Sequence, residues 1–180
     1  AAEGNSGTTT FSFTVGLSGA SNASISDGSG LGTILDDGTG GGGTDDDRPS
    51  LSVSDANVTE GTDPYAIFTV SLSNASDEAV SVNLALATVS ATVGTDTGAT
   101  AALEVSSDGG TSWTPATSAT IAAGQTSVLV RTAITDDPLD EALESFTLTA
   151  TKTAGSTTNA SAFGTGSITD DDATPSLSID

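Results

Sequence analysis

The sequence predicts an all-β protein folded as an antiparallel β-sandwich, and two observations carry that prediction. Apolar residues alternate with small or polar ones in many short runs, and no stretch keeps the 3.6-residue apolar spacing of a helix. Gly, Asn and Asp residues separate these runs, as they do between short strands. An alternating run places one face on a core and the other in water, which suits two antiparallel sheets packed face to face.

Five segments show the alternation clearly and are expected to be strands. In each, apolar side chains share one face at alternate positions; the segments are 11–17, 68–72, 80–86, 128–134 and 146–150. The Ser-Asp-Gly-Gly sequence at 107–110 predicts a tight turn between 103–105 and a further strand near Trp113.

Short motifs recur along the chain and predict its organisation. Glu3-Gly4 and Glu60-Gly61 each precede a Phe-Thr-Val segment, and Pro-Ser-Leu-Ser at 49–52 returns at 175–178. The Gly-Thr-Ile-Leu-Asp-Asp sequence at 32–37 corresponds to Gly-Ser-Ile-Thr-Asp-Asp at 166–171. The predicted parts are a partial β repeat at 1–37, a Gly- and Asp-rich linker at 38–48, a complete sandwich at 49–172 and the first strand of a following repeat at 173–180.

The partial repeat at 1–37 is expected to need further strands from outside itself. It contains only opening and closing strands, too few for an independently stable sandwich. The chain is therefore expected to join neighbouring repeats or identical subunits head-to-tail, the latter by strand donation, with Leu177 and Ile179 buried against residues such as Phe11 and Phe13. The alternative is that 174–180 is a loose tail.

The charge balance excludes several classes of function. The chain has 24 acidic residues, 3 basic residues and no histidine, for a net charge of −21. Such a chain repels nucleic acid, and no apolar run approaches the length that spans a bilayer. Without His or Cys it also lacks the commonest general base and thiol nucleophile, so we expect no nucleic-acid partner, no membrane insertion and no enzymatic activity.

Acidic residues of the main unit gather in three places. Glu60 follows a strand, a run from Asp136 to Glu144 fills a loop, and Asp170, Asp171 and Asp172 end the last strand. Neighbouring carboxylates repel one another, whereas Ca²⁺ takes about six to eight oxygen ligands, often from such loops. The three segments can meet at one end of a Greek-key sandwich, so the pattern favours bound calcium over the alternative of a solvated acidic linker.

These motifs resemble the Calx-beta family. The stretch 134–146, with Asp-Asp, then Glu, then Glu-x-Phe, is similar to its signature, and 58–61 and 168–172 resemble its opening and closing motifs. The resemblance implies a seven-stranded, immunoglobulin-like Greek-key sandwich with calcium at one tip. The ligands that it implies are Glu60, Asp136, Asp137, Glu141, Asp170, Asp171 and Asp172.

Four further positions are candidate ligands on weaker grounds. Asp96 matches a Gly-x-Asp-Tyr position of the family, although Thr97 replaces the Tyr. Glu3, Asp36 and Asp37 occupy the equivalent positions of the partial repeat.

The predicted hairpin at 103–113 is similar to repeats of giant calcium-dependent bacterial adhesins of the RTX type. This resemblance implies an extracellular, cell-surface segment that Ca²⁺ rigidifies into an extender or filament. A sugar- or peptide-binding module is the alternative, with Tyr65 and Trp113 as candidate contacts. Trp113 is otherwise expected to pack the hairpin against the sandwich.

Overall fold

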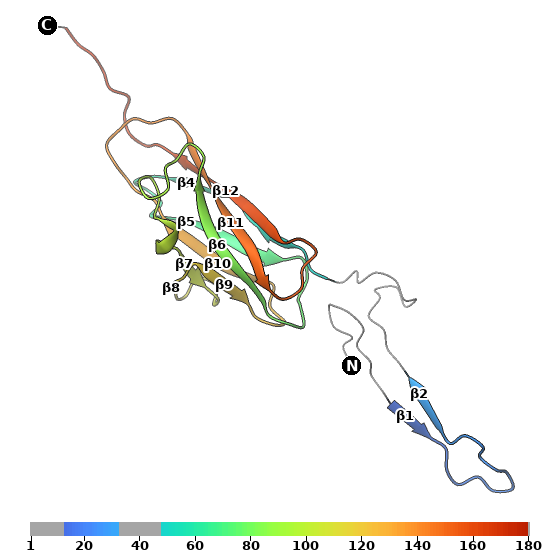
Figure 1. Cartoon of the computed structure of the whole chain (residues 1–180). Helices are drawn as coiled ribbons and strands as arrows, with labels where there is room; N and C mark the ends of the chain where they lie inside the picture. Colours follow the sequence, from blue (N-terminus) through green and yellow to red (C-terminus); the bar gives the residue numbers. More distant parts are fainter. Residues whose placement is uncertain (1–12, 33–47, 180) are drawn as a thin grey trace. The chain divides into compact units, whose positions relative to one another are not determined.

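The structure is a computed structural model that describes residues 13–32 and 48–179 (Figure 1). The chain forms two compact units, Ala1–Arg48 and Pro49–Asp180. In the first unit, β1 (Phe13–Gly16) pairs antiparallel with β2 (Ser29–Gly32). The candidate ligands Glu3, Asp36 and Asp37 lie outside the described residues, so their role stays a prediction.

The second unit is a sandwich of two five-stranded sheets, which confirms the predicted all-β fold. The first sheet has the order β3 (Leu51–Val53), β5 (Tyr65–Leu72), β10 (Ser127–Ala133), β7 (Glu104–Ser106) and β8 (Thr114–Pro115). The second has the order β4 (Ala56–Thr59), β12 (Ser161–Thr169), β11 (Glu144–Ala154), β6 (Val80–Thr88) and β9 (Ser118–Ile121). A short 3-10 turn, η1 (Thr100–Ala102), precedes β7.

One strand pair departs from the antiparallel pairing that the sequence predicts. β4 runs parallel to β12, with Ala56 opposite Gly166. The chain crosses from the first sheet to the second at Ser54 and Asp55 without reversing, so β4 continues in the direction of β3. Asp55 accepts a hydrogen bond from the Thr165 amide (2.8 Å), and a Cβ at Gly164 would lie 2.0 Å from the Ser54 carbonyl oxygen, so the crossing needs a glycine there.

The core lies between the sheets, and alternate apolar residues of four predicted strands, at 68–72, 80–86, 128–134 and 146–150, form much of it. The inward side chains of β5, β6, β10 and β11 are buried. At the centre, the rings of Phe68 and Phe146 meet edge to face, with centroids 5.8 Å apart. A Cβ at Gly166 would lie 2.4 Å from the Phe146 ring, so this glycine makes room for the aromatic pair.

The predicted hairpin is present and is tied to the sheet by an arginine. β7 and β8 pair antiparallel around the turn at 107–110. The indole of Trp113 donates a hydrogen bond to the Gly110 carbonyl (3.1 Å). The Arg131 guanidinium lies 3.9 Å from the ring centroid of Tyr65 and 4.3 Å from that of Trp113, while its Nε donates to Glu104 (2.7 Å). Trp113 thus packs the hairpin onto β10.

No helix in the part of the chain that the structure describes is long and apolar enough to cross a membrane.

Candidate metal centre

Three acidic segments meet at one end of the sandwich, where β4, β10 and β12 finish. The parallel pairing of β4 with β12 continues past the strands, because the Glu60 amide donates to the Thr169 carbonyl (3.1 Å). Glu60 and Asp170 therefore leave the sheet side by side. The loop after β10 folds onto them, since the Glu141 amide donates to the Asp170 carboxylate (2.9 Å). The segments predicted to converge do so.

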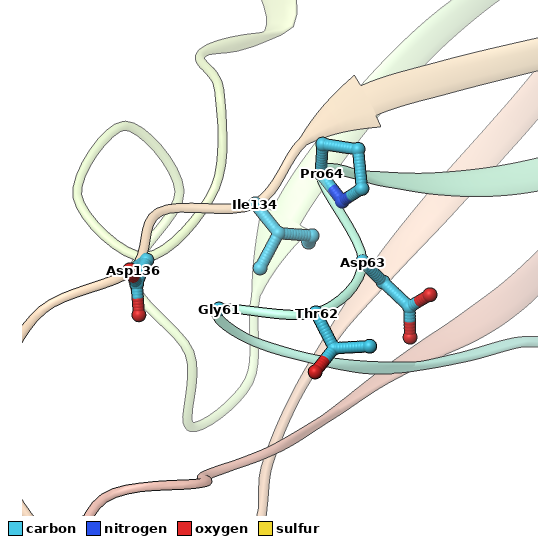
Figure 2. A pocket seen from close by; sticks show the side chains of 6 residues that line it. All are labelled: Gly61, Thr62, Asp63, Pro64, Ile134 and Asp136. Atoms are coloured by element: carbon cyan, nitrogen blue, oxygen red, sulfur yellow. The ribbon is translucent and has the colours of Figure 1, made fainter.

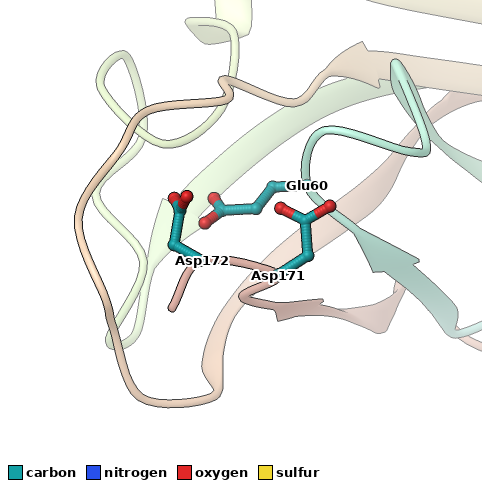
Figure 3. Close-up of side chains that lie close together, drawn as sticks. All are labelled: Glu60, Asp171 and Asp172. Atoms are coloured by element: carbon teal, nitrogen blue, oxygen red, sulfur yellow. The ribbon is translucent and has the colours of Figure 1, made fainter. Parts of the chain in front are cut away.

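The tightest group at this end is Glu60, Asp171 and Asp172, shown in Figure 3. One carboxylate oxygen of each residue lies within 4.8 Å of the others. Glu60 is 5% exposed, Asp172 is half-buried and Asp171 is exposed. A buried residue with two more accessible neighbours gives a site that is anchored in the fold and open to solvent on one side.

Gly61 brings Asp136 to the same place. A Cβ on Gly61 would lie 2.8 Å from Oδ2 of Asp171 and 3.1 Å from Oδ1 of Asp136, so both carboxylates face this glycine. Gly61 also has φ of +69°, a left-handed conformation that favours glycine. Glu60 therefore supplies a buried carboxylate, and Gly61 leaves room for the carboxylates of Asp136 and Asp171.

A hollow of about 370 Å³ adjoins this group (Figure 2). It is lined by Gly61, Thr62, Asp63, Pro64, Ile134 and Asp136. The Asp63 carboxylate accepts a hydrogen bond from the Thr59 amide (2.9 Å), so it serves the turn after β4. Asp136 borders both the hollow and the acidic group.

Other predicted ligands have partners within the protein. The two carboxylate oxygens of Asp170 accept hydrogen bonds from the amides of Glu141 and Asp172, each at 2.9 Å. Asp137 accepts one from the Leu139 amide (2.9 Å). These carboxylates hold the backbone of the acidic loops in place, and they add negative charge to the group formed by Glu60, Asp136, Asp171 and Asp172.

Asp96 lies beside Glu144, an acidic residue that is absent from the predicted ligand set. The Asp96 side chain accepts a hydrogen bond from the Thr92 amide (2.5 Å), and its backbone carbonyl accepts one from the Thr135 amide (3.0 Å). Burial and the neighbouring Asp96 carboxylate raise the pKa of Glu144. Glu144 begins β11 two residues before the core residue Phe146, and that position beside the acidic loop is the signal that points to it.

The electrostatics of the group show an excess of negative charge. Burial, together with a hydrogen bond to Asp170 and the charges of Asp170, Glu141 and Asp137, raises the pKa of Glu60 to about 7. Burial and the neighbouring charges of Asp170 and Asp171 also raise the pKa of Asp172. In contrast, the hydrogen bonds from the Asp172 and Glu141 amides lower the pKa of Asp170.

Two buried oxygens in this group lack a partner. Within the described part of the chain, Oε1 of Glu60 and Oδ2 of Asp172 are buried and accept no hydrogen bond. The salt bridge of Arg131 goes to Glu104 of β7 and not to this group. A buried oxygen without a donor is costly, so the arrangement calls for a bound cation or a proton.

The donor set fits a hard divalent cation. Every candidate donor is a carboxylate oxygen, and the group lacks the nitrogen and sulfur donors typical of zinc sites. Glu60, Asp171 and Asp172 would hold the ion, and Asp136 faces the same glycine as Asp171. When bound, Ca²⁺ would supply positive charge to the two unpartnered oxygens.

Comparison with known proteins shows the fold. No family model matches the sequence, and no curated protein does. Among solved structures, the calcium binding domain CBD12 of CALX1.1 is similar with a TM-score of 0.50 and 16% identity, covering 68% of this chain and 44% of that one. The apo-form Calx CBD1 domain has a TM-score of 0.47 and 16% identity, covering 68% of this chain and 99% of its own. The chain thus has a Calx-beta-type sandwich fold and spans less than half of the length of the first of these structures.

Proposed function

We propose that the unit Pro49–Asp180 is a calcium-binding structural module of an extracellular repeat protein. The observation that carries the proposal is the pair of buried, unpartnered carboxylate oxygens of Glu60 and Asp172 among further acidic residues. A cation that binds the folded state alone stabilises it by mass action. Similarity to the calcium binding domain of CALX1.1 and the resemblance to RTX-type adhesin repeats support the choice of calcium.

The position of the site suggests what the ion does mechanically. Asp171 and Asp172 are followed directly by the segment through which the chain leaves the sandwich (Figure 1). Thr174 donates a hydrogen bond to Asp140 of the acidic loop (3.4 Å), so this segment starts against the same end. A cation bound to Asp172 fixes the direction of the exit, and a row of such modules becomes a stiff extender at the cell surface.

Calcium titration of the full chain tests this proposal. Isothermal titration at pH 7.5 is expected to show saturable Ca²⁺ binding, with a dissociation constant in the micromolar to millimolar range of sensor and extracellular sites. Mg²⁺ is expected to bind more weakly, because it demands octahedral geometry and gives up its waters reluctantly. Asp55→Asn is the matched control, since Asp55 already accepts a hydrogen bond from Thr165 and should not affect binding. Absence of Ca²⁺ binding at millimolar concentration contradicts the proposal.

Head-to-tail strand donation is a second candidate, favoured by the exposed residues Leu177 and Ile179. Their side chains are 96% and 94% exposed, and they alternate with serines as in a strand. The same Pro-Ser-Leu-Ser sequence at 49–52 contributes to β3, which pairs with β5 and buries Leu51. The segment at 175–179 therefore has the sequence of an edge strand and is available to a neighbouring repeat or subunit.

Sedimentation of the full chain tests strand donation. Filaments that form with the wild type and are lost in the double variant Leu177→Asp and Ile179→Asp would support it. Val89→Asp is the control, because Val89 is 62% exposed elsewhere on the sandwich. A wild type that stays monomeric at high concentration, with and without calcium, excludes donation between separate chains.

A further inference from the structure

The outer face of the β4–β12–β11–β6–β9 sheet is uncharged across its central strands. Because alternate residues point to opposite faces, the residues between the buried positions of β6, β11 and β12 form this outer face. Its central residues are Asn83, Ala85, Ala87, Thr147, Thr149, Thr151, Ser161, Phe163 and Thr165. In a chain with a net charge of −21, a sheet face without carboxylates is a distinctive surface.

Phe163 is the one large apolar side chain among these nine residues. It is 67% exposed, and it lies directly opposite Thr149, which in turn lies opposite Ala85. The ring therefore lies in water and not in the core of the sandwich. An exposed aromatic ring is a flat apolar surface that a ligand can cover, so Phe163 is the candidate contact of this face.

Hydroxyl and amide groups surround the Phe163 ring. On one side of it along the strands, Thr165 lies opposite Thr147. On the other side, Ser161 lies opposite Thr151, which in turn lies opposite Asn83 on β6. Neighbouring strands lie about 4.8 Å apart, so these groups form a regular array beside the ring. Among the described residues, no protein group is hydrogen-bonded to the hydroxyls of Thr147, Thr149 and Thr151.

We propose that this face binds a neutral polysaccharide, with a sugar ring stacked on Phe163 and its hydroxyl groups bonded to the flanking Thr and Ser side chains. The C–H face of a pyranose is apolar and packs on the electron-rich face of an aromatic ring. Hydroxyl side chains both donate and accept hydrogen bonds, as sugar hydroxyls do. A strongly anionic chain repels acidic polysaccharides, so the ligand is uncharged.

The other aromatic candidates are less available for stacking. The Arg131 guanidinium lies against the rings of both Tyr65 and Trp113, and the Trp113 indole nitrogen is bonded to Gly110. The two aromatic side chains that the sequence suggested as sugar contacts thus have a packing role in the first sheet, and Phe163 is the freely exposed ring of the second.

A protein partner suits this face less well than a sugar. Stable protein interfaces bury about 800 Å² on each partner and depend on several large anchoring side chains. This face has a single aromatic ring, and most of the side chains around it are small and carry hydroxyl groups. Binding by one flat site is weak, but a row of modules along one chain multiplies it through avidity.

Affinity electrophoresis of the calcium-loaded full chain tests the proposal. Gels contain dextran, mannan or hydroxyethyl cellulose as neutral probes and alginate as an acidic one. At least one neutral polysaccharide is expected to retard the protein, and alginate is not. Phe163→Ala is expected to weaken the retardation at least about tenfold. Val89→Ala, which removes another exposed apolar side chain, is expected to leave it unchanged.

Three results overturn the proposal. They are no retardation by any neutral probe, equal retardation of the wild type and Phe163→Ala, and retardation by alginate as strong as by the neutral probes. Sedimentation of both proteins without sugar adds a check: if the wild type dimerises and Phe163→Ala does not, the face is a self-association surface and the proposal is wrong. These outcomes leave the calcium proposal untouched, because Phe163 is not part of the acidic group.

Discussion

Two acidic regions of the sandwich shift the pKa of a carboxyl group in opposite directions. In the β7–β8 turn, Asp108 accepts hydrogen bonds from the Ser106 hydroxyl (2.7 Å) and from the amide (2.9 Å) and hydroxyl of Ser112. These donors lower the pKa of Asp108 to about 2. At the acidic end, burial and neighbouring carboxylates raise the pKa of Glu60 to about 7. The difference shows that local donors, rather than the number of acidic residues, decide whether the turn itself stabilises a carboxylate or leaves its oxygens without a donor.

The largest loss of calcium affinity is expected from the substitution Glu60→Gln. The change keeps the shape of the most buried candidate ligand and removes its charge. We expect calcium affinity to fall at least about 10- to 100-fold, the loss typical of changes to residues that support a metal site. The calcium-free protein should be no less stable than the wild type, because repulsion within the group decreases. Isothermal titration and thermal unfolding measure the two effects, and an unchanged affinity removes Glu60 from the site.

A smaller loss of affinity is expected from Gly61→Ala, which leaves every carboxylate in place. The new Cβ would press on Asp171 and Asp136, and the positive φ would cost about 1 kcal/mol of stability. Gly124→Ala is the matched control, since Gly124 also has a positive φ (+77°) and a Cβ there meets nothing within 4 Å. Both variants should lose similar stability without calcium, but only Gly61→Ala should bind calcium less tightly. Equal affinities would mean that Asp136 and Asp171 do not act together.

The two turns are also expected to differ in the sign of their pH dependence. Folding raises the pKa of Glu60 from 4.5 to about 7. Protonation of Glu60 therefore stabilises the calcium-free folded protein fully below pH 4.5, and this contribution is lost as the pH rises to about 7. Folding lowers the pKa of Asp108 from 3.8 to about 2, so its contribution is present above pH 3.8 and is lost as the pH falls through about 2.

Urea unfolding of the wild type, Glu60→Gln and Asp108→Asn across this pH range separates the two contributions. Glu60→Gln should flatten the decline between pH 4.5 and 7, and Asp108→Asn should flatten the one below pH 3.8. The same decline in the wild type and in Glu60→Gln would show that Glu60 titrates normally.

The smallest effect is expected from Asp108→Asn at neutral pH. The amide keeps one acceptor oxygen and loses the charge that the Ser106 and Ser112 hydroxyls stabilise, so the melting temperature should fall by a few degrees. The fall should be the same with and without calcium, because the hairpin supplies its own donors. A fall confined to calcium-loaded protein would place a cation at Asp108 and end the contrast between the turns.

The sequence predicted most of the fold because alternation is a local signal. The buried faces of β5, β6 and β11 follow directly from the apolar positions of each strand, and the Gly-Gly turn at 109–110 specified the hairpin. The parallel pairing of β4 with β12 was missed, since it depends on how the chain crosses between sheets at Ser54 and Asp55.

The acidic end was predictable as a region but not residue by residue. Clustering and the family resemblance placed the three segments together, yet neither showed that both oxygens of Asp170 are taken by backbone amides while Glu60 and Asp172 keep unpartnered ones. That distinction depends on loop geometry, which alternation and spacing do not contain. The exposure of Phe163 was likewise hidden, because β12 is not among the segments whose alternation predicted a buried face, and glycines occupy most of its buried positions.

Thermal unfolding in millimolar calcium and in excess chelator at pH 7.5 tests the central claim, that cations complete the acidic end, most directly. Calcium at about 100 times its dissociation constant stabilises the folded state by about 2.7 kcal/mol. For a domain of this size the melting temperature should rise by roughly 10 °C. Asp108→Asn should show the same rise, and Glu60→Gln little of it. Equal melting temperatures of the wild type with calcium and with chelator would contradict the claim.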